Sequence, residues 1–279
     1  MNAADLYAPD IAAVLDLERI DQHIYRGRNP ASAAKRRALF GGQVAAQALM
    51  AAGLTVPDDR RVHSLHGYFL RSGRIDRPVI LRVDADRDGR SFSARHVVAL
   101  QEGEVIFSML ASFQTGSHEG VLDEPRRSDV PAPEYCAPGG FDALVDVRSV
   151  TKFSVEDDKI RFPDCLWARI PGEFPDDPLS HACALTYVSD MGSGFGQMDW
   201  DLPNAGPSLD HAIWFHEPVR ADDWMLIHMW PRKAMGIRGL YDGTIRDRSG
   251  RLLASIAQEH LLVLRDRPPH MKPGAKKPA

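Results

Sequence analysis

Three polar residues in the second half of the chain have side chains that could position or activate water. Gln258 lies in the alternating apolar segment 252–264, where a primary amide needs a hydrogen-bond partner. Asp190 ends a segment of helical composition, and a carboxylate buried there could act as a base. Ser208 directly precedes an apolar strand. The positions alone leave an alternative open for each residue. Gln258 could be a core amide bonded to backbone, Asp190 an exposed carboxylate at a helix end, and Ser208 a serine in a turn.

Histidines offer a second route to acid–base chemistry. His63 and His66 lie three residues apart in one predicted strand, so we expect them on opposite faces and not in one pocket. A strand with that spacing is not a zinc site, and the sequence offers no third ligand. We therefore interpret both as structural, and treat His211 and His216 in the same way.

The composition is that of a globular protein with no strong charge. The 279 residues include 34 basic and 38 acidic side chains, and 44% are apolar. This balance gives no general attraction to nucleic acid, and no apolar run is long enough to span a membrane. The amino terminus does not resemble a secretory signal, and three scattered cysteines do not indicate a disulfide framework. We expect a cytoplasmic protein.

Each half of the chain shows the same order of elements. A strand candidate precedes one helix, and four strand candidates follow it. The helices are expected at 43–52, opened by Gly41-Gly42, and at 182–189, opened near Pro178. The leading strands are expected at 17–26 in the first half and at 143–153 and 166–170 in the second. The later strands are expected at 62–71, 78–86, 91–101 and 104–114, and at 209–217, 224–230, 238–247 and 251–264.

An internal offset supports this repeat. Phe69 corresponds to Phe215 at an offset of 146, and Gly103–Ile106 corresponds to Gly250–Leu253 at 147. The pattern predicts an α+β fold of two β-α-β4 units, each with its own antiparallel sheet wrapped round a central helix. The predicted divisions are an amino-terminal unit at 1–118, a linker at 119–140, a carboxy-terminal unit at 141–266 and a flexible tail at 267–279.

Several longer motifs resemble one known family. They are FGGQVAAQAL at 40–49, VHSLHGYFLR at 62–71, DGRSFSAR at 88–95, SLDHAIWFH at 208–216 and AQE at 257–259. Together these segments resemble the type II acyl-CoA thioesterases, the TesB-like double-hotdog enzymes. The resemblance runs from about residue 17 to residue 264 and is weaker between 115 and 180.

The resemblance implies hydrolysis of fatty acyl-CoA to a free fatty acid and CoA by activated water, without a covalent intermediate, metal or cofactor. It also implies a catalytic trio, which falls on Asp190, Ser208 and Gln258. The developing oxyanion needs a donor, and we expect a backbone N–H at the helix entry Gly41-Gly42-Gln43.

Only the second unit carries the trio. With the two halves aligned, the trio positions correspond to Met50, Val62 and Ala111 in the first unit, none of which is polar. The sequence therefore predicts one active site per chain, near the interface of the units.

Two other functions fit the same fold. An enoyl-thioester hydratase or dehydratase would use an Asp/His pair, and Asp210 and His211 are adjacent, although strand neighbours point to opposite faces. A non-catalytic acyl-CoA-binding protein would have no use for a water-orienting trio.

The basic segments 35–37 and 60–61 are interpreted as surface or as contacts to the CoA phosphates. Exposed sheet edges make a homo-oligomer possible.

Overall fold

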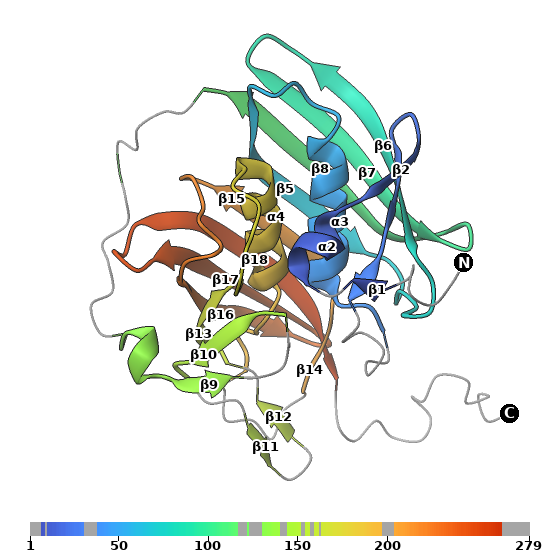
Figure 1. The fold of residues 1–279 in the computed structure, drawn as a ribbon. Coiled ribbons are helices and arrows are strands. Elements are labelled where there is room, and N and C mark those ends of the chain that lie inside the picture. Colours follow the sequence, from blue (N-terminus) through green and yellow to red (C-terminus); the bar gives the residue numbers. More distant parts are fainter. Residues whose placement is uncertain are drawn as a thin grey trace, which may run out of the picture.

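Two central helices lie side by side, and one large sheet curves around them (Figure 1). The computed structural model describes residues 7–8, 10–30, 38–116, 122, 130–139, 144–151, 154–156, 159–161, 163–196 and 204–263. The helices are α2 (Ile11–Leu15), α3 (Gly41–Gly53), α4 (Pro178–Ser189) and the short 3-10 helix η2 (Pro133–Tyr135). No helix in these ranges is long and apolar enough to cross a membrane.

In the described part of the chain, the main sheet has fourteen strands, all paired antiparallel. Thirteen follow the order β2-β3-β6-β7-β8-β5-β15-β18-β17-β16-β13-β10-β9, and β14 pairs with β18. In the first half the strands are β2 (Glu18–Asp21), β3 (Ile24–Gly27), β5 (Arg60–Phe69), β6 (Val79–Asp88), β7 (Phe92–Gln101) and β8 (Glu104–Thr115). In the second half they are β9 (Ala137–Gly139), β10 (Asp146–Ser149), β13 (Cys165–Arg169), β14 (Asn204–Ser208), β15 (Asp210–Phe215), β16 (Met225–Met235), β17 (Arg238–Asp247) and β18 (Leu252–Val263). Two small sheets are separate from the main sheet. One pairs β1 (Tyr7–Ala8) with β4 (Asn29–Pro30), and the other pairs β11 (Ser154–Glu156) with β12 (Lys159–Arg161).

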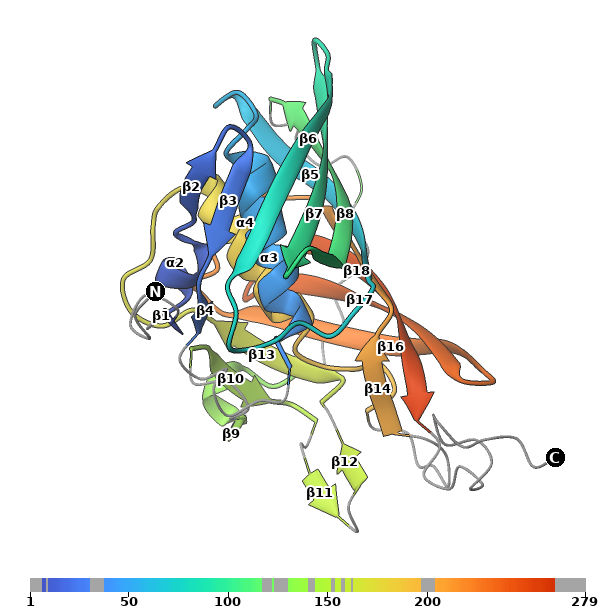
Figure 2. The same ribbon diagram turned by 90° about the vertical axis from the view of Figure 1, so that its right-hand side faces the viewer.

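The predicted β-α-β4 repeat with antiparallel sheets is confirmed, and the sheets of the two units join edge to edge into one continuous sheet. Strand β5 of the first half pairs with β15 of the second, with Leu65 opposite Ile213. Each of these strands would otherwise be an unpaired edge, and their pairing satisfies both rows of backbone groups. The strand order is mirrored about this pair, and Figure 2 shows the continuous sheet from the side.

Helices α3 and α4 form the buried centre because both are apolar on nearly all sides. Residues 42–52 of α3 and 180–189 of α4 are buried. The helices run antiparallel in close contact. A Cβ at Gly42 would lie 2.4 Å from the Tyr187 carbonyl oxygen, and one at Gly53 would lie 2.4 Å from the Leu179 side chain. Glycine at position 42 therefore permits the backbones to approach.

The structure also departs from the predicted strands, most clearly in the following segments. The segment expected as one strand at 17–26 is a hairpin, turning at His23 with a φ of 58°. Strand β9 lies inside the expected linker, and β14 was not predicted. The predicted tail at 267–279 lies outside the described residues.

Candidate active site

Asp190, Ser208 and Gln258 come together although they lie on three different elements. Asp190 directly follows α4, Ser208 ends β14, and Gln258 lies within β18. The Gln258 amide nitrogen donates to Asp190 Oδ1 at 2.6 Å and to Ser208 Oγ at 2.5 Å. The Ser208 hydroxyl donates to Asp190 Oδ1 at 3.4 Å. A molecule that contacts one of these groups is therefore within reach of the others.

The second carboxylate oxygen of Asp190 caps helix α3. Phe40 precedes this helix and offers no side-chain cap, and Asp190 Oδ2 accepts the Gly42 N–H at 2.8 Å. The positive end of the α3 dipole thus faces a carboxylate from the other half of the molecule. A Cβ at Gly41 would lie 2.7 Å from the same oxygen, so the glycine pair makes room for this contact.

This cap changes the role expected for Gly42. The sequence predicted the Gly41–Gln43 entry as the oxyanion donor, but the Gly42 N–H is bound to Asp190. Its observed role is to hold the carboxylate at the junction of the two units. The N–H groups of Gly41 and Gln43, in the first turn of the same helix, remain the predicted donors.

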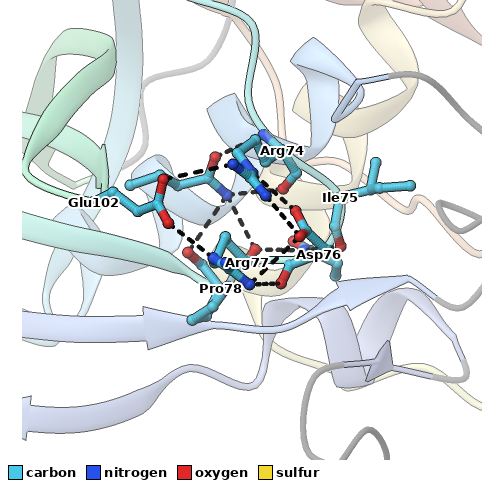
Figure 3. Close-up of polar contacts among 8 residues, drawn as sticks. Arg74, Ile75, Asp76, Arg77, Pro78 and Glu102 are labelled. Carbon is cyan, nitrogen blue, oxygen red and sulfur yellow. Dashed lines mark hydrogen bonds and ion pairs between the residues drawn. The ribbon is translucent and has the colours of Figure 1, made fainter.

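A network of hydrogen bonds connects the first turn of α3 to a neighbouring loop. The Gln43 amide donates to Asn29 Oδ1 at 2.9 Å, and the Asn29 amide donates to the carbonyls of Ile75 and Arg77 at 3.0 and 2.7 Å. Figure 3 shows the side chains around this loop, where Arg74 and Arg77 pair with Asp76 and Glu102. The hydrogen bond from Arg74 holds the pKa of Asp76 at about 2. The hydrogen bonds from Asn29 thus connect the loop at 74–78 to the start of α3.

A strand irregularity sets the position of Ser208. Strand β14 pairs with the end of β18, and the register shifts between Ala205 and Ser208, which lies opposite His260. The side chains of Ser208 and Asp190 are only partly buried, whereas Gln258 is 1% exposed. The trio therefore has a fixed buried end at the amide and a more accessible end at the serine and carboxylate.

Comparison with known proteins identifies the family. Residues 29–114 match the acyl-CoA thioesterase N-terminal domain, and residues 130–262 match the acyl-CoA thioesterase C-terminal domain. The chain belongs to the acyl-CoA thioesterase family. This thioesterase is 34% identical to acyl-coenzyme A thioesterase 8 of Homo sapiens, over 92% of this chain and 90% of the relative.

Solved structures agree with this assignment. An acyl-CoA thioesterase II, TesB2, from Mycobacterium marinum has a TM-score of 0.76 and 38% identity, over 94% of this thioesterase and 99% of that chain. A protein of unknown function with a hot dog fold from Alicyclobacillus acidocaldarius has a TM-score of 0.71 and covers 92% of this chain and 98% of its own. Its 18% identity supports the fold alone. The predicted family and double-hotdog fold are confirmed.

Three histidines of the thioesterase, half-buried or exposed, have partners outside the trio. His63 Nε2 hydrogen-bonds Ser112 Oγ at 2.8 Å, and the His66 ring lies edge-on to Trp214. His216 Nε2 bonds Ser255 Oγ at 2.9 Å. Among the residues described, no group of three His, Cys, Asp or Glu side chains could hold a metal ion.

His211 lies behind the trio, in the core of the thioesterase. Its Nε2 hydrogen-bonds Ser189 Oγ at 2.7 Å, and Ser189 in turn donates to the Thr186 carbonyl. Burial lowers the pKa of His211, and the charges of Asp190 and Asp210 only partly oppose that shift. A neutral His211 supports the end of α4 next to Asp190.

One neighbour of the trio was missed by the sequence reasoning. Tyr241, on β17, lies directly opposite Gln258 and donates its hydroxyl to Gln258 Oε1. The strands expected at 238–247 and 251–264 form a hairpin, but pairing them without a bulge places Tyr241 opposite Ala257. The register shift between Ile245 and Arg246 moves the pairing to Gln258.

Proposed function

We propose that this thioester hydrolase cleaves fatty acyl-CoA to a free acid and CoA by direct attack of water held by Asp190, Ser208 and Gln258. The observation that carries the proposal is the convergence of the three groups, with Gln258 Nε2 2.6 Å from the carboxylate. The family assignment and the acyl-CoA thioesterase relatives support the substrate class.

The trio divides the work on one water molecule. The Asp190 carboxylate takes a proton from the water while the water oxygen attacks the thioester carbon. The Gln258 amide and the Ser208 hydroxyl fix the water by hydrogen bonds. The carbonyl oxygen gains negative charge as the C–O bond forms. When the carbonyl forms again the C–S bond breaks, CoA leaves as a thiolate with the electron pair of that bond, and the proton on Asp190 passes to the thiolate. In this scheme no side chain forms a covalent bond to the acyl group.

The oxyanion donor is proposed at the first turn of α3. The N–H groups of Gly41 and Gln43 lie beside the Gly42 N–H that binds Asp190, so a carbonyl placed there would be close to the water site. A thioester carbonyl can approach this backbone closely because Gly41 and Gly42 lack side chains.

The two alternative functions find less support. Asp210 Oδ1 accepts the Glu259 N–H at 2.6 Å, whereas His211 bonds Ser189, so the two side chains do not form the acid–base pair of a hydratase. A non-catalytic acyl-CoA-binding protein gives no reason for an amide, a hydroxyl and a carboxylate to share one site.

Release of free CoA tests the proposal. Purified protein is incubated with acyl-CoA of several chain lengths, and the thiol is followed with a chromogenic reagent. We expect Asp190→Asn to lower kcat by about 100-fold or more with a smaller change in KM, because general base catalysis is removed. Asp86→Asn, at an exposed position on β6, is the matched control and is expected to retain wild-type turnover.

Near-normal turnover in Asp190→Asn would contradict the mechanism. With an enoyl-CoA as the substrate, loss of the enoyl absorbance without thiol release would instead indicate the hydratase, and binding without either change would indicate the acyl-CoA-binding protein.

Compartment and assembly are proposed on separate grounds. The thiols of Cys136, Cys165 and Cys183 are unpaired, which is typical of cytoplasmic proteins. Strand β2 ends the main sheet and is exposed along its whole length, so it offers an edge for pairing with a second copy. Light scattering at several protein concentrations measures the resulting mass.

A further inference from the structure

The proposed chemistry requires Gln258 to present its nitrogen, and not its oxygen, to the water site. The two ends of a primary amide have nearly the same shape, so only hydrogen-bond partners decide which end points where. Asp190 and Ser208 accept from Nε2. The remaining oxygen, Oε1, is buried with the rest of the side chain, and it needs a donor.

Tyr241 supplies that donor from the neighbouring strand. Tyr241 lies directly opposite Gln258 in the β17–β18 pair and is 1% exposed, and its hydroxyl donates to Gln258 Oε1. We propose that Tyr241 is a positioning residue for hydrolysis, which fixes the Gln258 amide with its nitrogen toward the reacting water. This inference rests on the proposed function.

The surroundings of Tyr241 favour this role. Burial, with further contributions from the charges of Asp190 and Asp210, raises the pKa of Tyr241 well above its ordinary value, so the hydroxyl keeps its proton. The ring is packed edge-on against Phe195 and His260, with centroids 6.4 and 5.5 Å away.

The backbone of Gly194 lies close to the base of the Tyr241 side chain. A Cβ at Gly194 would lie 2.5 Å from the Cβ of Tyr241, so a larger residue at position 194 would displace the tyrosine. A hydrogen bond to Oε1 also polarises the amide, which strengthens the N–H groups on its other end as donors.

The test removes only the hydroxyl. We expect Tyr241→Phe to lower kcat about 10-fold while KM changes less than about 2-fold, because the amide orients the water and not the acyl-CoA. Tyr25→Phe is the matched control, since Tyr25 is also buried but lies on β3 in the other half of the sheet. This control retains wild-type kcat.

A double-mutant cycle separates positioning from general packing. In a Gln258→Ala background the hydroxyl has no amide to orient, so adding Tyr241→Phe should lower kcat no further. If Tyr241→Phe does not fold, 4-fluorophenylalanine at position 241 fills the same space without donating and should show the same loss of kcat. Replacement by 4-aminophenylalanine keeps a donor and should retain most of the activity.

The outcomes distinguish this inference from the proposed function. Wild-type kcat in Tyr241→Phe, or an equal loss in the wild-type and Gln258→Ala backgrounds, overturns the positioning role and leaves the trio intact. Wild-type kcat in Gln258→Ala would overturn both.

Discussion

Asp190 belongs both to the proposed catalytic trio and to the contacts that hold the two halves together. One of its oxygens accepts from Gln258 and Ser208, and the other caps α3 through Gly42. The carboxylate lies at the carboxyl end of α4, whose dipole disfavours negative charge, and at the amino end of α3, whose dipole favours it. The contact with α3 thus offsets the unfavourable position on α4.

Ser208 should matter through its hydroxyl alone. That group accepts from Gln258 and donates to Asp190, so it holds the amide and the carboxylate at a fixed spacing. We expect Ser208→Ala to lower kcat about 10- to 100-fold, whereas Ser208→Thr, which keeps the hydroxyl, retains most of the activity. Steady-state kinetics of CoA release measures both. Equal turnover in the alanine and threonine variants would remove Ser208 from the mechanism.

His260 should make the folded protein sensitive to acid. Burial lowers the pKa of His260 from 6.5 to about 4. As the pH falls below 6.5 the unfolded chain takes up a proton that the folded protein does not, so stability is lost between about pH 6.5 and pH 4. At about pH 5 this cost is about 2 kcal/mol.

The variant His260→Leu cannot take up this proton. We expect its free energy of unfolding, measured by urea titration, to fall less than that of the wild type between about pH 7 and pH 5. An unchanged m-value controls for the denatured state. Parallel pH dependence in the two proteins would show that His260 does not titrate on unfolding.

At the scale of the elements, local patterns could be predicted and long-range pairing could not. The composition of 43–52 predicts α3, and alternation predicts most strands to within two or three residues. Strand β14 was missed because its Asn-Ala-Gly-Pro-Ser sequence has no apolar alternation and is held by pairing with β18. The β5–β15 pair joins strands more than 140 residues apart, and nothing local specifies that contact.

The candidate site shows the same division. Residue types and motifs singled out Asp190, Ser208 and Gln258. The partner of each atom depends on register and helix packing, which is why the Gly42 cap and the Tyr241 hydrogen bond were not foreseen.

Gly42 should be the most sensitive glycine of α3. A Cβ there would lie 2.4 Å from the backbone oxygen of Tyr187, so the two helices must separate. We expect Gly42→Ala to lower the free energy of unfolding by about 1–3 kcal/mol and to reduce kcat, because the Asp190 carboxylate loses its anchor. Thermal unfolding and kinetics measure the two effects.

Gly53→Ala provides the control at the other end of the same helix. Its new Cβ would meet the flexible side chain of Leu179, which can move aside. We expect a smaller loss of stability and unchanged kcat. If both variants lose kcat equally, the local contact with Asp190 is not the cause.

At the scale of the whole molecule, the two halves mirror each other in fold but not in polarity. Strands β5, β8, β7 and β6 follow one another outward from the central pair, as β15, β18, β17 and β16 do on the other side. The first half contributes the backbone of Gly42 to the site, and the second contributes the three polar side chains. Neither half therefore holds a complete site.

This asymmetry predicts one active site per chain. In the sequence alignment of the two halves, Gln258 corresponds to Ala111, which is buried on β8, and Asp190 corresponds to Met50 in α3. Neither side chain can orient water, and Met50 lies within the helix, so it cannot cap α4 as Asp190 caps α3. Calorimetric titration with a non-hydrolysable acyl-CoA thioether should saturate close to one equivalent per chain. A stoichiometry near two, retained in Gln258→Ala, would mean that the first half binds acyl-CoA without these polar groups, and the junction would no longer be the single place where the thioester is held.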